Sequence, residues 1–313
     1  MSYLDDRRLM VKIANLYYEA GETQSTIAKK IGVSRSLISK YLSKSKELGI
    51  VEIIIHDEDY STVSSLETKL ENQYGLREAI CVPDTEQSNS KIQLGTAASK
   101  YLHRMIRDDQ VVGVSSGTTL YEVATAMSSN QHFPNVCFVP IVGGMGDERV
   151  DIHANHIVAK LAEALKATYH LLHAPVVVDS KETREIILKQ PSIKNTLELG
   201  SKADIAIVGI GGTPEHSTMV RSYINSGITD DLDFDEIAGD ICYNFINENG
   251  EVVNNSWNEK TITLELNKLK QIPLVVGVAA GVEKVNAIKA ALREDLIDVL
   301  ITDEKTARLL LEG

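Results

Sequence analysis

Short apolar runs alternate with helical stretches along most of the chain, and this alternation constrains the fold more than any other feature. The apolar runs lie at residues 78–82, 110–114, 136–142, 204–210, 272–278 and 298–302. Stretches with helical periodicity lie between or after them, for example at residues 91–106, 118–128, 153–167, 282–292 and 303–311. Strands that are apolar on both faces are typical of a parallel sheet with helices on each side. The pattern therefore predicts one large, mostly parallel α/β domain.

The first 50 residues differ from this body in charge. They contain nine Lys or Arg and five Asp or Glu, which is a net charge of +4. The whole chain carries −12, so residues 51–313 carry −16. An acidic body with a basic head indicates that only the head meets a polyanion.

The basic head has the pattern of an all-α helix-turn-helix domain. An apolar helix pattern at residues 9–20 is followed by a short helix, a break at Gly32 and a longer helix that runs to Leu48. Thr23 and Ser34 stand where the N-caps of the second and third helices belong. A short helix, a glycine turn and a basic helix together favour helix-turn-helix over an ordinary helical hairpin with a polar outer face.

One face of the longer helix predicts contact with the major groove of double-stranded DNA. Ser36, Ser39 and Lys40 share this face, where small hydroxyls allow close approach and lysine neutralises phosphate. Arg35 can form two parallel hydrogen bonds with a guanine edge, which makes it the best candidate for reading sequence. The predicted DNA contacts are Gln24, Ser34, Arg35, Ser36, Ser39, Lys40 and Lys44.

Glycine-containing loops follow four of the predicted strands, at residues 113–124, 141–148, 208–215 and 277–288. Ligands bind at the carboxyl ends of the strands in such sheets. The first loop reads Ser-Ser-Gly-Thr-Thr before a helix, so its amides and hydroxyls can hold a phosphate or sugar hydroxyls. Any single loop is equally well explained as a tight turn. Four loops at one edge favour a polar pocket for a small ligand.

Several other classes of site have no support in the sequence. The glycine loops match neither a dinucleotide fingerprint nor a P-loop, and no hydrolase elbow is present. Three widely spaced cysteines and two His pairs form no disulfide framework or zinc pattern. We therefore expect no metal, no cofactor and no catalytic residue. The absence of a long apolar segment or an N-terminal signal predicts a cytoplasmic protein without a membrane partner.

The head and the loops together resemble the SorC family (SorC/DeoR-type) of bacterial sugar-responsive transcriptional regulators. The resemblance covers nearly the whole chain and begins with the helix-turn-helix pattern at residues 11–42. The body carries six similar blocks in the family order, which are VGVSSGTT (112–119), VPIVGG (139–144), VGIGG (208–212), GDICYNFINENG (239–250), GVAAGVEK (277–284) and ITDEKTA (301–307).

The resemblance implies a Rossmann-like body related to sugar-phosphate isomerases and deaminases. This body binds an effector, a sugar or sugar phosphate, without transforming it, and the protein forms a homotetramer that bridges operator sites. The implied domains are a head at residues 1–55, a linker at 56–65 and an effector-binding and oligomerisation domain at 66–313. Position by position, the implied effector contacts are Ser116, Gly117, Thr118, Thr119, Gly143, Gly144, His153, Asn155, Asp240 and Lys284.

Two departures from the family pattern narrow the range of ligands that we expect. Some members carry a lysine before the double glycine that bonds covalently to an aldehyde sugar, but this chain has Val142 there, so no imine is expected. The arginine nearest to the double glycine is Arg149, so a second phosphate has no evident partner. A single phosphate, or an unphosphorylated ketose or polyol, fits better than a bisphosphate.

Two functions from different classes follow from this pattern. The leading one is a DNA-binding regulator of a carbohydrate-utilisation operon. The alternative is a sugar-phosphate isomerase or deaminase with an accessory DNA-binding head. Such an enzyme needs a placed acid and base, and the sequence offers only Asp240 with any support.

Overall fold

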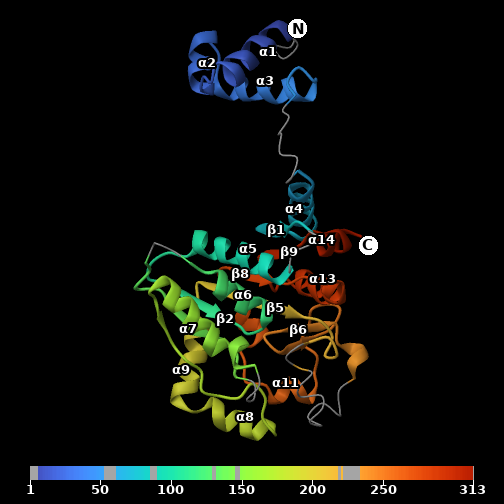
Figure 1. Ribbon diagram of the computed structural model, residues 1–313. Helices are drawn as coiled ribbons and strands as arrows, with labels where there is room; N and C mark the ends of the chain where they lie inside the picture. Colours follow the sequence, from blue (N-terminus) through green and yellow to red (C-terminus); the bar gives the residue numbers. More distant parts are fainter. Residues whose placement is uncertain are drawn as a thin grey trace. The chain divides into compact units, whose positions relative to one another are not determined.

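A computed structural model describes residues 6–52, 61–84, 90–128, 132–144, 149–217, 220 and 233–312. The chain divides into two compact units, Met1–Ser61 and Thr62–Gly313 (Figure 1). Residues 56–60 of the predicted linker at 56–65 lie outside the described residues. Its last residues belong to helix α4 (Ser61–Tyr74), which begins earlier than predicted because Val63 is buried one turn before Leu66.

The first unit contains the helices that the sequence predicts for the head. They are α1 (Arg7–Ala14), which continues as the π-helix η2 (Asn15–Glu19), α2 (Gln24–Ile31) and α3 (Arg35–Glu47). Thr23 and Ser34 cap α2 and α3, since their side chains accept hydrogen bonds from Thr26 N and Leu37 N. Gly32 ends α2 at φ 78°, a left-handed conformation that suits glycine.

One small core holds the three head helices together. Met10 and Ile13 of α1, Ile27 of α2, and Ile38 and Tyr41 of α3 are all buried in it. Since Ile38 and Tyr41 point into the core, the positions between them on the helix are left facing outward. The core therefore determines which side of α3 is presented to a partner.

The second unit is built on a mostly parallel sheet in the order β1-β9-β8-β5-β2-β3-β4. The strands on this path are β1 (Glu78–Val82), β2 (Val111–Val114), β3 (Cys137–Pro140), β4 (Thr168–Tyr169), β5 (Ile205–Gly211), β8 (Val275–Val278) and β9 (Val299–Asp303). All pairings between these strands are parallel. The predicted strands are all present, which confirms the α/β fold.

Helices cover both faces of this sheet (Figure 1). One face packs against α5 (Ser90–Met105), α6 (Thr118–Ala126) and α7 (Ala154–Leu165). The other packs against α4, α13 (Val285–Arg293) and α14 (Glu304–Leu311), with α9 (Pro191–Gly200) beside β2 and β3. Burial on both faces explains why the strands carry almost no polar residues.

A hairpin that the sequence did not predict pairs with the carboxyl end of β5. Strand β6 (Gly239–Ile241) pairs antiparallel with β5 and with β7 (Asn244–Ile246). Only Cys242 and Tyr243 connect the two strands, and both have positive φ, 52° and 61°. Two such residues form a type I′ turn, which usually contains Asn-Gly. Two bulky residues there mean that the turn is strained.

The remaining described elements lie on the outside of the sheet or cross its end. They are η3 (Val150–Ile152), α8 (Lys181–Leu188), η4 (Phe234–Glu236), α11 (Ser256–Lys260), α12 (Leu266–Leu269) and η5 (Val282–Lys284). Across the described ranges, no helix is long and apolar enough to cross a membrane. The same residues contain no group of three His, Cys, Asp or Glu side chains placed to hold a metal ion.

Candidate functional site

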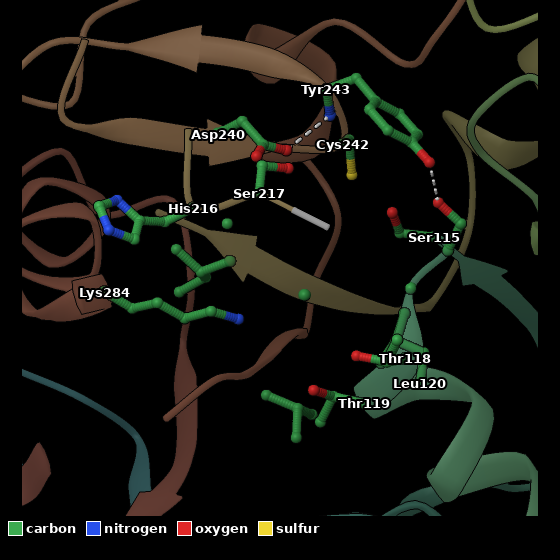
Figure 2. A pocket seen from close by; sticks show the side chains of 16 residues that line it. Ser115, Thr118, Thr119, Leu120, His216, Ser217, Asp240, Cys242, Tyr243 and Lys284 are labelled. Carbon is green, nitrogen blue, oxygen red and sulfur yellow. Dashed lines mark hydrogen bonds between the residues drawn. The ribbon is translucent and has the colours of Figure 1, made fainter. Parts of the chain in front are cut away.

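A polar cavity lies where three neighbouring strands, β2, β5 and β8, reach their carboxyl ends, and its empty volume of about 580 Å³ includes open solvent. The loops after these strands and the β6–β7 hairpin enclose it (Figure 2). This position follows from the topology, because parallel strands bring their following loops to one edge. Its lining is made of Ser115, Ser116, Gly117, Thr118, Thr119, Leu120, Gly209, Ile210, Gly211, His216, Ser217, Asp240, Cys242, Tyr243, Val278 and Lys284.

One side of the cavity is the N-terminus of helix α6. No side chain caps this helix, and its first two residues are Thr118 and Thr119. Gly117 precedes them at φ 124°, a conformation that L side chains rarely adopt, and its N–H donates to Ile152 O at 2.9 Å. The uncapped amides and the positive end of the helix dipole favour an anion here.

Lys284 supplies a positive charge to the same cavity. It ends η5 immediately before α13, and its side chain extends toward the middle of the cavity from the side opposite Thr118 and Thr119 (Figure 2). Burial lowers the pKa of the Lys284 ammonium, and the charge of Asp240 opposes that shift. An anionic ligand group near the ammonium would compensate its lost hydration.

Asp240 supplies the negative charge of the cavity. It is 8% exposed, and its Oδ2 accepts a hydrogen bond from Tyr243 N at 3.2 Å. Its Oδ1 is buried and has no hydrogen-bond partner among the described residues. Burial raises the Asp240 pKa to about 6, although Lys284, the Tyr243 N–H and Ser217 lower it. A carboxylate that lines the cavity is a suitable acceptor for ligand hydroxyls.

Gly211 makes room for this carboxylate. A Cβ at Gly211 would lie 1.9 Å from Asp240 Oδ1, a distance that no side chain tolerates. β5 and β6 pair Gly211 directly with Asp240, which explains the close approach. The glycine of the third predicted loop is therefore needed for space around Asp240 as well as for its turn.

The double glycine of the second predicted loop is not part of the cavity lining. A Cβ at Gly143 would lie 2.5 Å from Pro175 O, and the Gly143 N–H donates to Ile262 O at 3.0 Å. The Gly144 N–H donates to Ala174 O at 2.9 Å. Both amides thus bond to the protein backbone, and a close contact with Pro175 accounts for the glycine at position 143.

His153 and Asn155 also lie outside the cavity lining. The Asn155 side chain donates to Leu172 O at 3.0 Å and accepts from Leu172 N at 2.9 Å, so both of its polar groups hold the backbone. His153 Nδ1 faces Gly144, at 3.9 Å from where a Cβ would stand. The sequence motif placed these residues in the pocket, whereas the structure uses Asn155 to fasten the segment after β4.

Tyr243, His216 and Ser217 line the cavity although the sequence analysis did not select them. Tyr243 Oη and Ser116 Oγ are 2.7 Å apart and share a hydrogen bond. Thr213 Oγ1 and His216 Nδ1 are 2.9 Å apart. Tyr243 stands three residues after Asp240 in the block at 239–250, but nothing in the spacing shows that the chain reverses between them.

In the head, the predicted DNA contacts share the outer side of α3 and the start of α2. Arg35, Ser36, Ser39 and Lys40 are exposed, as the packing of Ile38 requires. Gln24 and Arg35 line one surface hollow, at the N-termini of α2 and α3. The α2 N-terminus in this hollow suits a backbone phosphate next to the groove.

Three of the predicted DNA contacts, Ser34, Ser36 and Lys44, already have partners within the protein. Ser34 Oγ lies 2.9 Å from Ser36 Oγ and also caps α3, so its first role is to hold the helix N-terminus. Lys44 Nζ bonds Glu47 Oε2 at 2.9 Å. Lys44 must exchange this partner for a phosphate when DNA is bound, whereas Arg35 has no such ion pair among the described residues.

Comparisons with known proteins agree with this architecture. The family model described as "Putative sugar-binding domain" matches residues 58–312. The chain is 33% identical over 319 residues to the sorbitol operon regulator of Klebsiella pneumoniae, covering 100% of both chains. It is 31% identical to the deoxyribonucleoside regulator of Bacillus subtilis, covering 98% of each.

A solved structure matches over nearly the same length. The crystal structure of the full-length sorbitol operon regulator SorC from Klebsiella pneumoniae has a TM-score of 0.76 and 34% identity, covering 98% of this chain and 99% of that one. The resemblance predicted from the six sequence blocks is therefore confirmed. With a matching sugar-binding body and a helix-turn-helix head, this chain belongs to the SorC family of sugar-binding transcriptional regulators.

Proposed function

We propose that this protein regulates a carbohydrate-utilisation operon, binding operator DNA with its head and a sugar or sugar phosphate in its body. The observation that carries the proposal is the cavity, where the uncapped α6 N-terminus and Lys284 can hold an anion while Asp240 can hold hydroxyls. The relatives named above, regulators of sorbitol and deoxyribonucleoside genes, support it.

The effector in this proposal has one anionic or strongly polar end. That end lies at Thr118 and Thr119, where helix amides, hydroxyls and the Lys284 ammonium surround it. Its hydroxyls lie at Asp240, whose carboxylate lines the cavity and can accept hydrogen bonds from them. In this arrangement four of the expected effector contacts do not touch the ligand and instead hold the surrounding backbone. They are Gly143, Gly144, His153 and Asn155.

The head binds double-stranded operator DNA through α3 in the major groove. Arg35 reads a base edge, Ser36 and Ser39 allow close approach, and Lys40 contacts phosphate at the edge of the groove. A homotetramer would carry several heads and could bridge operator sites. An effector that favours one arrangement of subunits over another would change the spacing of the heads and so the affinity for DNA. Such a regulator would act in the cytoplasm.

A gel-shift or footprinting experiment tests the DNA half of the proposal. The full-length protein is expected to protect a site upstream of sugar-uptake genes. A sugar or sugar phosphate is expected to change that protection. The absence of a protected site, with and without candidate sugars, would refute the proposal.

A thermal-shift panel of sugars and sugar phosphates tests the effector half. A true effector at a hundred times its dissociation constant adds about 2.7 kcal/mol to the free energy of unfolding. Asp240→Ala and Lys284→Ala should abolish the shift, because they remove the two charges that face the cavity. A shift that persists in both variants would place the ligand elsewhere.

The alternative function, a sugar-phosphate isomerase or deaminase, has one observation in its favour. His216 lines the cavity together with Asp240, so two titratable groups that could move protons are present. Turnover of D-fructose 6-phosphate or D-glucosamine 6-phosphate by the purified protein, lost in His216→Ala, would support the enzyme. Binding of the same compounds without turnover supports the sensor.

A further inference from the structure

We infer that Tyr243 is a positioning residue that joins the two ends of the cavity and fixes the distance between them. The inference rests on the proposed effector function and deepens it, because that distance selects which sugar or sugar phosphate fits. Tyr243 contacts both ends of the cavity. Its N–H donates to Asp240 Oδ2 at 3.2 Å, and its hydroxyl shares a 2.7 Å hydrogen bond with Ser116 Oγ (Figure 2).

The Ser116 bond connects Tyr243 to the anion-binding end. Ser116 directly precedes Gly117, the residue before helix α6, so the bond ties Tyr243 to the loop that carries the anion-binding end as a whole. Strand β2 leads into this loop, whereas Asp240 belongs to the separate β6–β7 hairpin. The side chain of Tyr243 thus links two elements that are 127 residues apart in sequence.

The backbone of the Tyr243 turn is held firmly on its far side. The indole of Trp257 donates to Tyr243 O at 2.8 Å, and Thr263 Oγ1 donates to Cys242 O at 2.7 Å. Asn244 Nδ2 adds bonds to Cys242 O and Leu264 O at 3.2 and 3.1 Å. These donors keep in place a turn whose two central residues have unfavourable positive φ.

The strained turn at Cys242 and Tyr243 orients Tyr243 in the cavity. A strained backbone persists only where many surrounding contacts hold it in place. Here the strained conformation directs the Tyr243 N–H to Asp240 and the Tyr243 ring to Ser116, at the two ends of one cavity. A relaxed Asn-Gly turn would have no ring to reach Ser116. Tyr243 is 3% exposed, so its hydroxyl is fixed before a ligand arrives.

The first test is a thermal unfolding cycle on the full-length protein without ligand. Tyr243→Phe and Ser116→Ala each remove one side of the shared hydrogen bond. The double variant is expected to lose no more in Tm than the worse of the two single variants, because the bond is already absent. Losses that add up would show that the two hydroxyls are independent and would overturn the inference.

The second test compares probes that reach one end or both ends of the cavity. Calorimetry would use inorganic phosphate, D-glucitol, D-fructose, D-ribose 5-phosphate, D-fructose 6-phosphate and D-glucitol 6-phosphate. Tyr243→Phe is expected to weaken the tightest sugar or sugar phosphate by about tenfold, the usual cost of one lost hydrogen bond. Inorganic phosphate, which needs only the α6 end, is expected to change less than twofold.

Tyr121→Phe is the matched control, since Tyr121 stacks on His156 and is not part of the cavity lining. It should bind every probe as the unaltered protein does. Equal losses for phosphate and sugars in Tyr243→Phe, or no loss for either, would refute the positioning role alone. If no probe binds the unaltered protein, the proposed effector function fails, and the inference fails with it.

Discussion

The DNA-contact side of the head and the cavity of the body use charge in opposite ways. On α3, Arg35 and Lys40 are exposed and hydrated, and the core behind them is mostly apolar. In the cavity, burial opposes the charge of both Asp240 and Lys284, raising one pKa and lowering the other. Exposed charges act nearly independently and weaken with salt, whereas buried ones depend on each other and on pH.

Loss of the buried ammonium should have the largest effect. Lys284→Met is expected to weaken a phosphorylated effector by about 2–5 kcal/mol, because a phosphate at the α6 N-terminus would lose its one cationic partner among the cavity-lining residues. Calorimetry with the best sugar phosphate measures this. Lys289→Met is the control, since Lys289 lies on helix α13, which directly follows Lys284, and bonds Glu312 O at 2.9 Å. Equal losses in the two variants would contradict the role of Lys284.

Asp240 should make the ligand-free protein less stable as pH rises. Because burial raises the Asp240 pKa from 3.8 to about 6, the folded state favours the protonated carboxyl. Its stabilising contribution is present below pH 3.8 and is lost as pH rises to about 6, a change of about 3 kcal/mol. Asp240→Asn should therefore be more stable than the unaltered protein at pH 7.5 and about equal at pH 4. Urea unfolding at both values checks this.

The exposed arginine should have a smaller effect that depends on DNA sequence. Arg35→Ala is expected to cost about 1–3 kcal/mol on the preferred operator and to relax the preference at one base pair. Competition gel shifts with operators altered at single positions measure both effects. A uniform loss on all sequences would show that Arg35 contacts phosphate instead of a base.

The smallest effect is expected for Lys44. Lys44→Ala should weaken all DNA sequences alike and reduce the slope of log affinity against log salt by about 1. The loss of DNA affinity is small because Lys44 must give up its 2.9 Å bond to Glu47 before it can contact a phosphate. Titrations at several salt concentrations measure the slope. An unchanged slope would remove Lys44 from the DNA contacts.

Much of the fold could be predicted because its signals are local. The strands of the main sheet are buried on both faces, so their composition alone marks them, and the head helices have hydroxyl caps at Thr23 and Ser34. The β6–β7 hairpin was missed because its turn contains Cys242 and Tyr243 where a turn signal would be Asn-Gly. Strand β4 was missed because it is short and exposed.

The candidate site was only partly predictable. The first loop and Lys284 converge because β2 and β8 end at the same edge of the sheet, and pairing of β6 with the end of β5 brings Asp240 to the same place. Gly143 and Asn155 could not be placed from sequence, because close packing on Pro175 and bonds to Leu172 involve partners far along the chain. The position of Tyr243 in the cavity depends on the chain reversal between β6 and β7, and no local sequence pattern shows that reversal.

The bulky turn at Cys242 and Tyr243 has a consequence for anyone who engineers this protein for robustness. A search guided only by folding energy would replace the pair with Asn-Gly, since those residues accept positive φ without cost. The exchange would relax the backbone, but it would also remove a buried ring and leave an enlarged, featureless hollow beside Ser116. Such a variant would still hold its operator and would no longer distinguish one metabolite from another.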